Sequence, residues 1–271
     1  MKVTIDELRQ LKPQQRESLP ALYLEHRDGS QNADMSCLFA HLSALRQLDL
    51  SGLSTANVTD MSYMFWRSRR LTWLDLACFD TAEVVNMEGM FSGCNALMLV
   101  NLSGFDTAKV KSMAEMFAHC CLLEKLDLSG FDTAKVENMS QMFRYCCELT
   151  SLDLSGFNFT NVTNMADIFD GCSNLQEVLL SDTLLRAKCL VKRVINKNKL
   201  PKGAFIDEHG NPCYYGYGNA GPYSAYEDRI HVPLSQLQYE DFGFDKTTKA
   251  EWRAYLGLTE KTKLKIVPHK E

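Results

Sequence analysis

The chain is built on a repeat of 26 residues, and this period is the feature that most constrains its fold. A short apolar triplet marks each unit, and its copies begin at Leu48, Leu74, Val100, Leu126, Leu152 and Val178. A second mark, Met-Phe or a close equivalent, begins at Leu38, Met64, Met90, Met116, Met142 and Ile168. One unit of this length cannot bury both of its faces, whereas stacked units share a continuous core. The sequence therefore predicts a solenoid.

Each unit begins with the pattern of a short strand, which is clearest in residues 97–105. Apolar and polar residues alternate there, so Val100 and Leu102 are expected to point inward and Leu99 and Asn101 outward. Because the copies lie one repeat apart, we expect these strands to pair in parallel along the concave side of the stack.

A helix is expected to follow each strand. Gly104 allows a turn, and Asp106 or Thr107 can cap a helix that begins there. The next apolar residues are spaced three and four apart, as on one face of a helix; they are Val110, Met113, Met116, Phe117 and Cys120. This pattern predicts an α/β solenoid, a leucine-rich-repeat horseshoe of parallel short strands and helices.

The repeat resembles that of a known family. Residues 126–143 read Leu-Asp-Leu-Ser-Gly-Phe-Asp-Thr-Ala-Lys-Val-Glu-Asn-Met-Ser-Gln-Met-Phe, which is similar to the repeat of BspA-like leucine-rich-repeat surface proteins of bacteria. The resemblance covers residues 34–183. It implies a horseshoe that binds proteins, often in adhesion or in contact with a host cell.

Three regions are expected along the chain. Residues 1–33 do not follow the repeat, and Thr4 can cap a short amphipathic helix that covers the end of the stack. Residues 34–183 form the solenoid. The period then stops, and residues 184–271 are long enough for a small mixed α+β domain.

The charge is divided unevenly between these regions. Of the 29 basic and 34 acidic residues, residues 184–271 contain 15 and 10, a balance of +5, which leaves 14 and 24 for residues 1–183, a balance of −10. A solenoid this acidic is not expected to bind nucleic acid.

No run of 18 apolar residues is present, so we expect no transmembrane segment. No signal peptide is seen in the charged first residues. We therefore expect a cytoplasmic protein, or one exported by a route without a cleavable N-terminal signal.

The outward strand positions form columns down the concave face, and these columns are the candidate partner-binding site. The acidic column contains Asp49, Asp75, Asn101, Asp127 and Asp153. The column on one side of it contains Trp73, Leu99, Lys125, Ser151 and Glu177. The column on the other side contains Ser51, Ala77, Ser103, Ser129, Ser155 and Ser181.

Two interpretations of the acidic column remain open. Stacked carboxylates repel one another by about 1 kcal/mol per pair in water, and a protein partner with a basic surface would relieve that repulsion. In the alternative, the carboxylates are hydrated and hydrogen-bonded by neighbouring serines. Trp73 and Leu99 are the stronger candidates for binding energy, because exposed large apolar side chains at a concave centre resemble interaction hot spots.

The cysteines divide into two groups. Cys94, Cys120, Cys146 and Cys172 step by one repeat within the apolar stripe. We interpret them as a buried column of free thiols, with a set of disulfides as the less favoured alternative. Cys121 and Cys147 follow two of them and are expected to be partly exposed.

Residues 184–271 contain the only candidates for catalysis or metal binding. Cys189, His209, Cys213 and His231 could form a Cys/His pair or a zinc site, although their spacing is irregular. The loop Gly216–Gly221 matches a dinucleotide fingerprint only literally, because no βαβ unit surrounds it. We therefore expect no cofactor and no metal. Residues 205–215 have the pattern of a hairpin.

These observations favour a non-catalytic protein-binding module that recognises its partner through the concave face. With the resemblance, they suggest a bacterial protein that acts in host interaction or adhesion. Two alternatives stay open. One is a secreted effector enzyme whose repeats bind the target while residues 184–271 act on it. The other is an intracellular scaffold or inhibitor.

Overall fold

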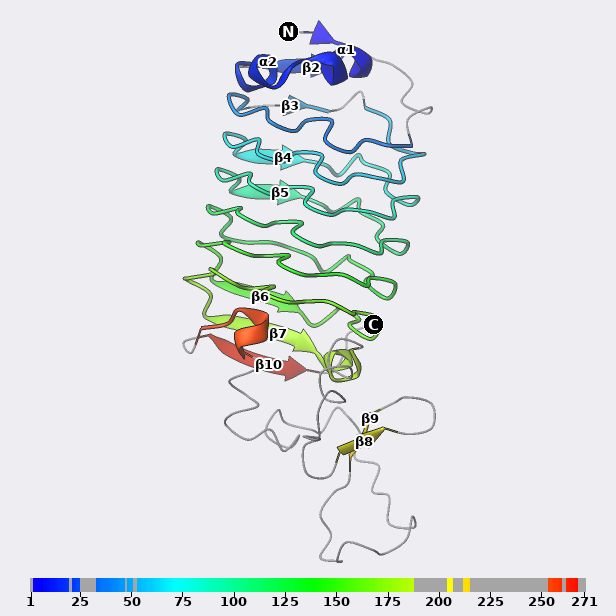
Figure 1. The fold of residues 1–271 in the computed structure, drawn as a ribbon, viewed down its shortest axis with the longest axis vertical. Helices are drawn as coiled ribbons and strands as arrows, with labels where there is room; N and C mark the ends of the chain where they lie inside the picture. Colours follow the sequence, from blue (N-terminus) through cyan, green and yellow to red (C-terminus); the bar gives the residue numbers. More distant parts are fainter. Residues whose placement is uncertain are drawn as a thin grey trace, which may run out of the picture.

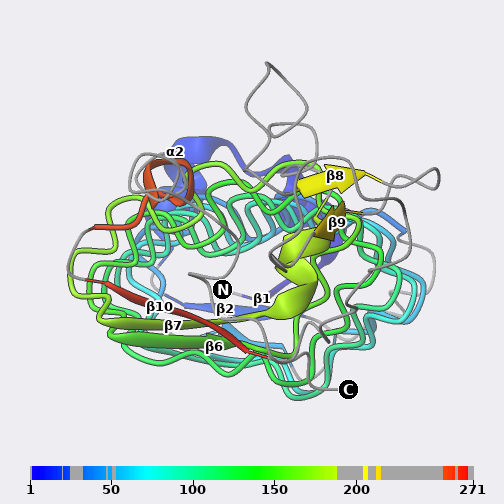
Figure 2. The same cartoon turned by 90° about the horizontal axis from the view of Figure 1, so that it is seen from below.

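The computed structural model describes residues 2–19, 21–24, 33–46, 48–50, 53–187, 204–206, 212–214, 253–259 and 262–267. Within these residues the chain winds into coils of one repeat each, which stack along the long axis of the molecule (Figure 1). We call the side of the stack that carries the short strands the strand side. The opposite side, which contains residues 60–68 and their equivalents in the other coils, is the turn side; the two sides are visible along the stack axis in Figure 2.

Two short helices lie at the N-terminal end of the stack, α1 (Ile5–Gln10) and α2 (Pro13–Glu17). Thr4 begins α1 with a capping box: its hydroxyl accepts the N–H of Glu7 at 3.2 Å, and the Glu7 carboxylate accepts the N–H of Thr4 at 2.9 Å. Leu8 of α1 is fully buried in the core. These helices therefore cover the apolar end that an open stack would expose.

A parallel sheet joins this N-terminal region to the coils. It contains β1 (Lys2–Val3), β2 (Leu22–Leu24) and β3 (Leu48–Asp49), in that order. Tyr23 of β2 is in register with Asp49 of β3. The region before the repeats thus provides a strand that continues the strand side by one more coil.

The remaining strands of the repeats pair in parallel with a register of one repeat. They are β4 (Trp73–Asp75), β5 (Leu99–Asn101), β6 (Ser151–Leu154) and β7 (Glu177–Ser181). Trp73 is opposite Leu99, and Leu152 is opposite Val178. Burial alternates along each strand as the pattern predicts: Val100 is buried and Leu99 is exposed.

The helices predicted on the other side of each coil are absent from the described repeats, and this prediction was wrong. On the turn side, every second N–H bonds to the next coil instead of within its own segment. Met61 and Tyr63 donate to the carbonyls of Asn86 and Glu88, at 2.9 and 2.7 Å, and Phe65 continues the pattern. The N–H groups between them close short turns, and left-handed residues such as Tyr63 (φ 55°) allow the alternation.

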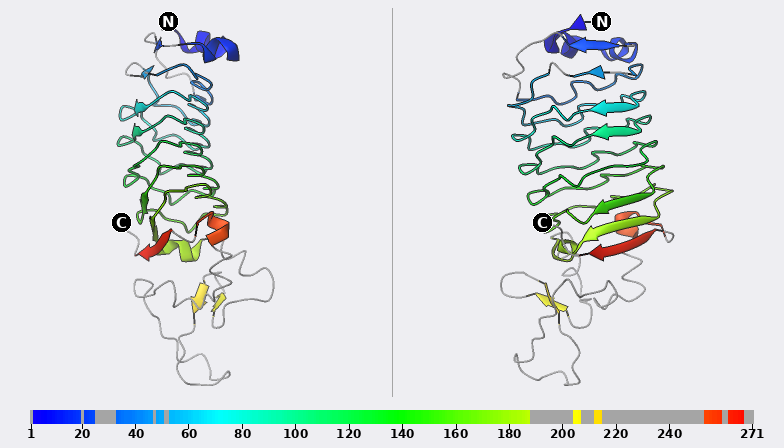
Figure 3. Two further views of the ribbon diagram at one scale, coloured as in Figure 1. Left: turned by 90° about the vertical axis from the view of Figure 1, so that its left-hand side faces the viewer. Right: turned by 180° about the vertical axis from the view of Figure 1, so that it is seen from behind.

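The spacing of the coils explains why this side is not helical. Paired strands lie about 4.7–4.9 Å apart, whereas packed helices need about 8–10 Å. Parallel bridges one repeat apart also run down the turn side, through Asp34, Asp60, Asn86, Ser112, Asn138 and Asn164. Both sides therefore have strand-like spacing, and no helical layer widens one side into the predicted horseshoe. The stack runs nearly straight (Figure 3).

The core consists of ladders of identical side chains. One ladder of stacked rings, with centroids 5.3–5.9 Å apart, contains Phe39, Phe65, Phe91, Phe117, Phe143 and Phe169. A thiol ladder lies beside it, in which each Sγ–H donates to a phenylalanine carbonyl at 3.0–3.3 Å; its members are Cys94, Cys120, Cys146 and Cys172. Ser68 occupies the same place one coil earlier and donates to the carbonyl of Phe39 at 2.7 Å. Side chains spaced three and four apart are thus buried without a helix.

The last described residues continue the stack. β10 (Lys263–Val267) pairs in parallel with β7, so Lys263 is opposite Glu177. The helical turn at residues 253–256 lies against the turn side of the last repeat, where Tyr255 and Leu256 accept the N–H groups of Asp167 and Phe169 at 2.7 and 2.8 Å. These residues were expected in a separate small domain, but they pack as a further coil.

The other elements of this region are short. The 3-10 helix η2 (Asp182–Arg186) follows β7 directly. β8 (Ala204–Ile206) and β9 (Pro212–Tyr214) form an antiparallel hairpin with Phe205 opposite Cys213, at the place where the sequence predicts one.

Candidate binding surface on the strand side

Two large apolar side chains lie exposed and adjacent on the strand side. Trp73 of β4 and Leu99 of β5 are opposite each other in the parallel register and are 53% and 54% exposed. Met98, which precedes Leu99, is 50% exposed. We call these three residues the apolar patch. Paired strands hold neighbouring side chains about 5 Å apart, so the patch is preorganised by the backbone.

The acidic column beside the patch is stabilised locally. Asp75 accepts the N–H of Ala77 at 3.2 Å and the side-chain amide of Asn101 at 2.9 Å. Asp127 accepts the N–H of Ser129 at 3.0 Å, and this backbone hydrogen bond holds the pKa of Asp127 below its ordinary value. Each carboxylate therefore closes the turn after its own strand. These local hydrogen bonds stabilise the column without a partner, and the exposed carboxylates stay available to one.

The sequence predicted that neighbouring serines would donate hydrogen bonds to these carboxylates, and the structure differs from this in part. The main donors are backbone N–H groups two residues further on, as also for Asp153, which accepts the N–H of Ser155 at 2.9 Å. A serine side chain takes part at Asp127, where a hydrogen bond from the side chain of Ser129 also lowers the pKa. Ser155 and Ser181 were expected to point outward, but they are 1% and 0% exposed. The serine column therefore does not line the strand side at its C-terminal end.

The other predicted site residues differ in their contacts. Asp49 of β3, Lys125 and Ser151 of β6 are exposed. Glu177 pairs instead with Lys265 of β10 at 2.5 Å, and this hydrogen bond lowers the pKa of Glu177. The added strand β10 thus extends the sheet beyond the C-terminal end of the predicted columns and supplies an ion-pair partner to Glu177.

Sequence reasoning missed two exposed side chains here, Met98 and Tyr23. Met98 occupies a position where the other coils have Thr72, Glu124, Thr150 and Gln176. A single apolar residue in a polar column is the signal that could have identified it. Tyr23 is 53% exposed and lies before the repeats, so the repeat pattern gave no signal for it.

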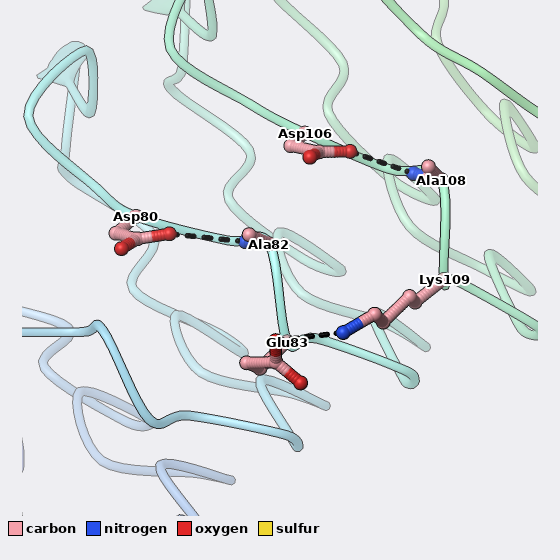
Figure 4. Close-up of polar contacts among 6 residues, drawn as sticks. All are labelled: Asp80, Ala82, Glu83, Asp106, Ala108 and Lys109. Atoms are coloured by element: carbon pink, nitrogen blue, oxygen red, sulfur yellow. Dashed lines mark hydrogen bonds and ion pairs between the residues drawn. The ribbon is translucent and has the colours of Figure 1, made fainter.

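The loop after each strand adds acidic groups beside the strand side. Asp80 accepts the N–H of Ala82 at 3.1 Å, and Asp106 accepts that of Ala108 at 3.0 Å (Figure 4). In the same loops, Lys109 pairs with Glu83 of the preceding coil at 2.6 Å. These aspartates cap turns, and their regular repetition contributes to the negative balance of the repeats.

The buried thiols are unsuited to nucleophilic chemistry. Burial raises the pKa of Cys94 and of Cys172 to about 12, so both stay protonated at neutral pH. All the described cysteines are free, and Cys121 and Cys147 are half-buried.

The other candidates for catalysis and for metal or cofactor binding come from residues 184–271, most of which lie outside the described part of the chain. Cys189, His209 and His231, and the Gly216–Gly221 loop, lie outside the described residues, and of Cys213 only the backbone in β9 is described. Among the described residues, no group of three or more His, Cys, Asp and Glu side chains could hold a metal ion. In the same part of the chain, no helix is long and apolar enough to span a membrane.

Comparison with known proteins identifies a family for most of the repeat region. The profile of the family described as "Mycoplasma protein of unknown function, DUF285" matches residues 15–97 and 70–182, which together cover more than half of the chain. No curated protein and no solved structure matches the chain.

Proposed function

The chain belongs to the DUF285 family, whose function is unknown, and from this premise we propose that it is a protein-binding module whose contact surface is the apolar patch. The observation that carries the proposal is the pairing of Trp73 and Leu99, both more than half exposed, on adjacent strands. Large apolar side chains that a rigid backbone holds in water resemble the hot spots of protein interfaces.

The size of the patch is consistent with a binding role. Covering the exposed half of a tryptophan removes about 100 Å² from water, which stabilises a complex by about 2–3 kcal/mol at about 25 cal/mol per Å². Leu99 and Met98 add to this area. The partner proposed here has an apolar segment to cover the patch, with basic residues that suit the exposed carboxylates beside it.

We also propose that the repeats are leucine-rich repeats of the BspA-like kind, used in adhesion or contact with a host. The support is the regular apolar spacing of the repeat and the parallel strand pairing one repeat apart. The straight stack without helices makes this an unusual form of that architecture.

The repeat itself supplies substitutions that test the patch without disturbing the backbone. Ser151 and Lys125 occupy the column of Trp73 and Leu99 in other coils. The double variant Trp73→Ser, Leu99→Lys therefore places residues that the same backbone already carries. Leu122, 45% exposed outside the patch, provides the matched control Leu122→Glu, because Glu148 occupies its position one coil later.

The experiment is affinity capture from bacterial and host lysates with the full chain and both variants, compared by quantitative mass spectrometry. We expect a protein that the wild type and Leu122→Glu capture equally and the double variant loses. Capture of the same proteins by the folded double variant would rule out the patch as the contact surface.

A further inference from the structure

A groove lined by arginines lies on the turn side near the N-terminal end of the stack. It has a volume of about 480 Å³, enough for a small organic ligand. Its polar lining comes from the end of α2 and from two successive coils; these side chains are Glu17, His41, Ser43, Arg67, Arg69 and Arg70. The groove is separate from the apolar patch, which lies on the strand side.

The three arginines are a departure from the repeat. In the next coil their places are taken by Gly93, Asn95 and Ala96. In the remaining coils the place of Arg70 is taken by Ala44, Leu122, Glu148 and Asn174. Since these neighbours maintain the same turn-side backbone, the stack does not need arginine at these positions.

The described side chains of the groove carry an excess of positive charge. Arg67, Arg69 and Arg70 are all exposed, and no ion pair within the described part of the chain involves them. Glu17 is the one acidic side chain among the described residues that line the groove. Burial and then the charge of Arg67 lower the pKa of His41, as expected where cations gather without enough counter-charge.

Two contacts hold this side of the groove in place. The guanidinium of Arg67 lies over the ring of Trp66, 4.5 Å from its centroid, and the ring of His41 packs edge-on against the same tryptophan at 4.7 Å. A guanidinium that stacks on an aromatic face keeps its N–H groups directed outward in the plane. Arg16 of α2 is engaged differently, because it donates to the carbonyls of Leu8 and Leu38.

We propose that this groove binds a phosphate monoester, with Arg67, Arg69 and Arg70 as its phosphate ligands. A planar guanidinium donates paired hydrogen bonds that match phosphate oxygens. Three arginines that form no ion pair with any described residue suit a dianion, and the volume leaves room for an organic group attached to the phosphate. The proposal is independent of protein binding at the apolar patch.

Calorimetric titration of phenyl phosphate into the full-length chain at low ionic strength tests the proposal. The variant Arg67→Gly, Arg69→Asn, Arg70→Ala carries the residues of the next coil, so its backbone is expected to be retained; circular dichroism checks this. Lysines elsewhere on the stack provide a control of equal charge, Lys109→Gln, Lys111→Gln, Lys135→Gln. We expect saturable binding that falls about tenfold or more in the arginine variant and changes less than about twofold in the lysine control.

A capped phosphoserine peptide, titrated in parallel, distinguishes the source of the phosphate. Tighter binding of the peptide than of phenyl phosphate points to a phosphorylated protein, and equal binding points to a small ester. The proposal is overturned if the wild type shows no saturable binding of either probe, or if the lysine control loses as much affinity as the arginine variant.

Discussion

The strand side and the turn side of the stack both join successive coils by backbone hydrogen bonds, but their backbone conformations differ. On the strand side, extended segments pair in register, so Trp73 lies opposite Leu99. On the turn side, left-handed residues alternate with short turns, and every second N–H crosses to the next coil. The spacing between coils, which backbone hydrogen bonds set on both sides, therefore overrides an apolar pattern that resembles a helix.

The two sides also differ in what they expose. The strand side carries the apolar patch, and the turn side carries the arginine groove. Each is a departure from the repeat at surface positions, whereas the core between them repeats with little change. We therefore expect core positions to control stability and the departures to control binding.

The largest effect is expected in the core that both sides share. Phe117 is fully buried and stacks between Phe91 and Phe143 at 5.3 and 5.9 Å. Phe117→Ala leaves a cavity and should lower the free energy of unfolding by about 3–5 kcal/mol in urea titrations. The control Leu122→Ala, at an exposed position, should change it by less than about 0.5 kcal/mol. Equal effects of the two substitutions would contradict the ladder core.

Glycine-to-alanine substitutions should have a smaller effect on the free energy of unfolding, and this effect should be larger at Gly93 than at Gly130. Gly93 on the turn side has φ +76°, and a Cβ there would lie 3.3 Å from Cγ of Arg67. Gly93→Ala should therefore cost about 1 kcal/mol of unfolding free energy. Gly130, in the turn at residues 129–130, has no atom within 4 Å of an added Cβ. Gly130→Ala should be neutral or slightly stabilising, and a cost as large as that of Gly93→Ala would remove this distinction.

Alkaline pH should weaken the thiol ladder. Burial raises the pKa of Cys94 from 9.0 to about 12, so the thiol stays protonated in the folded chain but ionises in the unfolded chain. The stabilisation that the protonated thiol gives the folded chain is complete well below pH 9 and is lost as the pH rises from about 9 toward 12. At pH 9 the loss is about 0.4 kcal/mol per thiol.

The matched variant for this measurement is Cys94→Ser. One coil earlier, Ser68 already occupies the position equivalent to Cys94 and makes the equivalent hydrogen bond. Between pH 7.5 and pH 9, under reducing conditions, the wild type should lose more unfolding free energy than the variant. Parallel curves would show that Cys94 ionises equally in both states.

The smallest effect on stability is expected at the patch. Trp73 and Leu99 are more than half exposed, so Trp73→Ser, Leu99→Lys should change the free energy of unfolding by less than about 0.5 kcal/mol. Thermal and urea unfolding measure this directly. A loss of 2 kcal/mol or more would mean that the patch serves folding, in contrast to its proposed role in binding.

The repeat period and the strand alternation could be predicted from the sequence because both depend on local spacing. Val100 and Leu102 are buried as their pattern indicates. The turn side could not be predicted in this way, since Met113, Met116 and Phe117 would be spaced alike on a helix. What excludes the helix is the distance between coils, which is a property of the assembled stack.

The candidate site was predicted in part. Trp73 and Leu99 lie exposed where the alternation places them, whereas Glu177 forms an ion pair with Lys265 of the neighbouring strand β10. That strand comes from far along the chain and does not follow the period, so no local pattern connects Lys265 with Glu177. The arginines of the groove could have been found, because no other coil has an arginine at these positions.

Site-specific photo-cross-linking tests most directly whether the strand side contacts the protein partner. A photoreactive phenylalanine analogue placed at Leu99 reports on the patch, and the same analogue at Leu122, which is also exposed, reports on surface outside it. The account predicts a cross-linked partner from position 99 and none from position 122. Cross-linking to the same partner from position 122 alone, or equally from both, would contradict it.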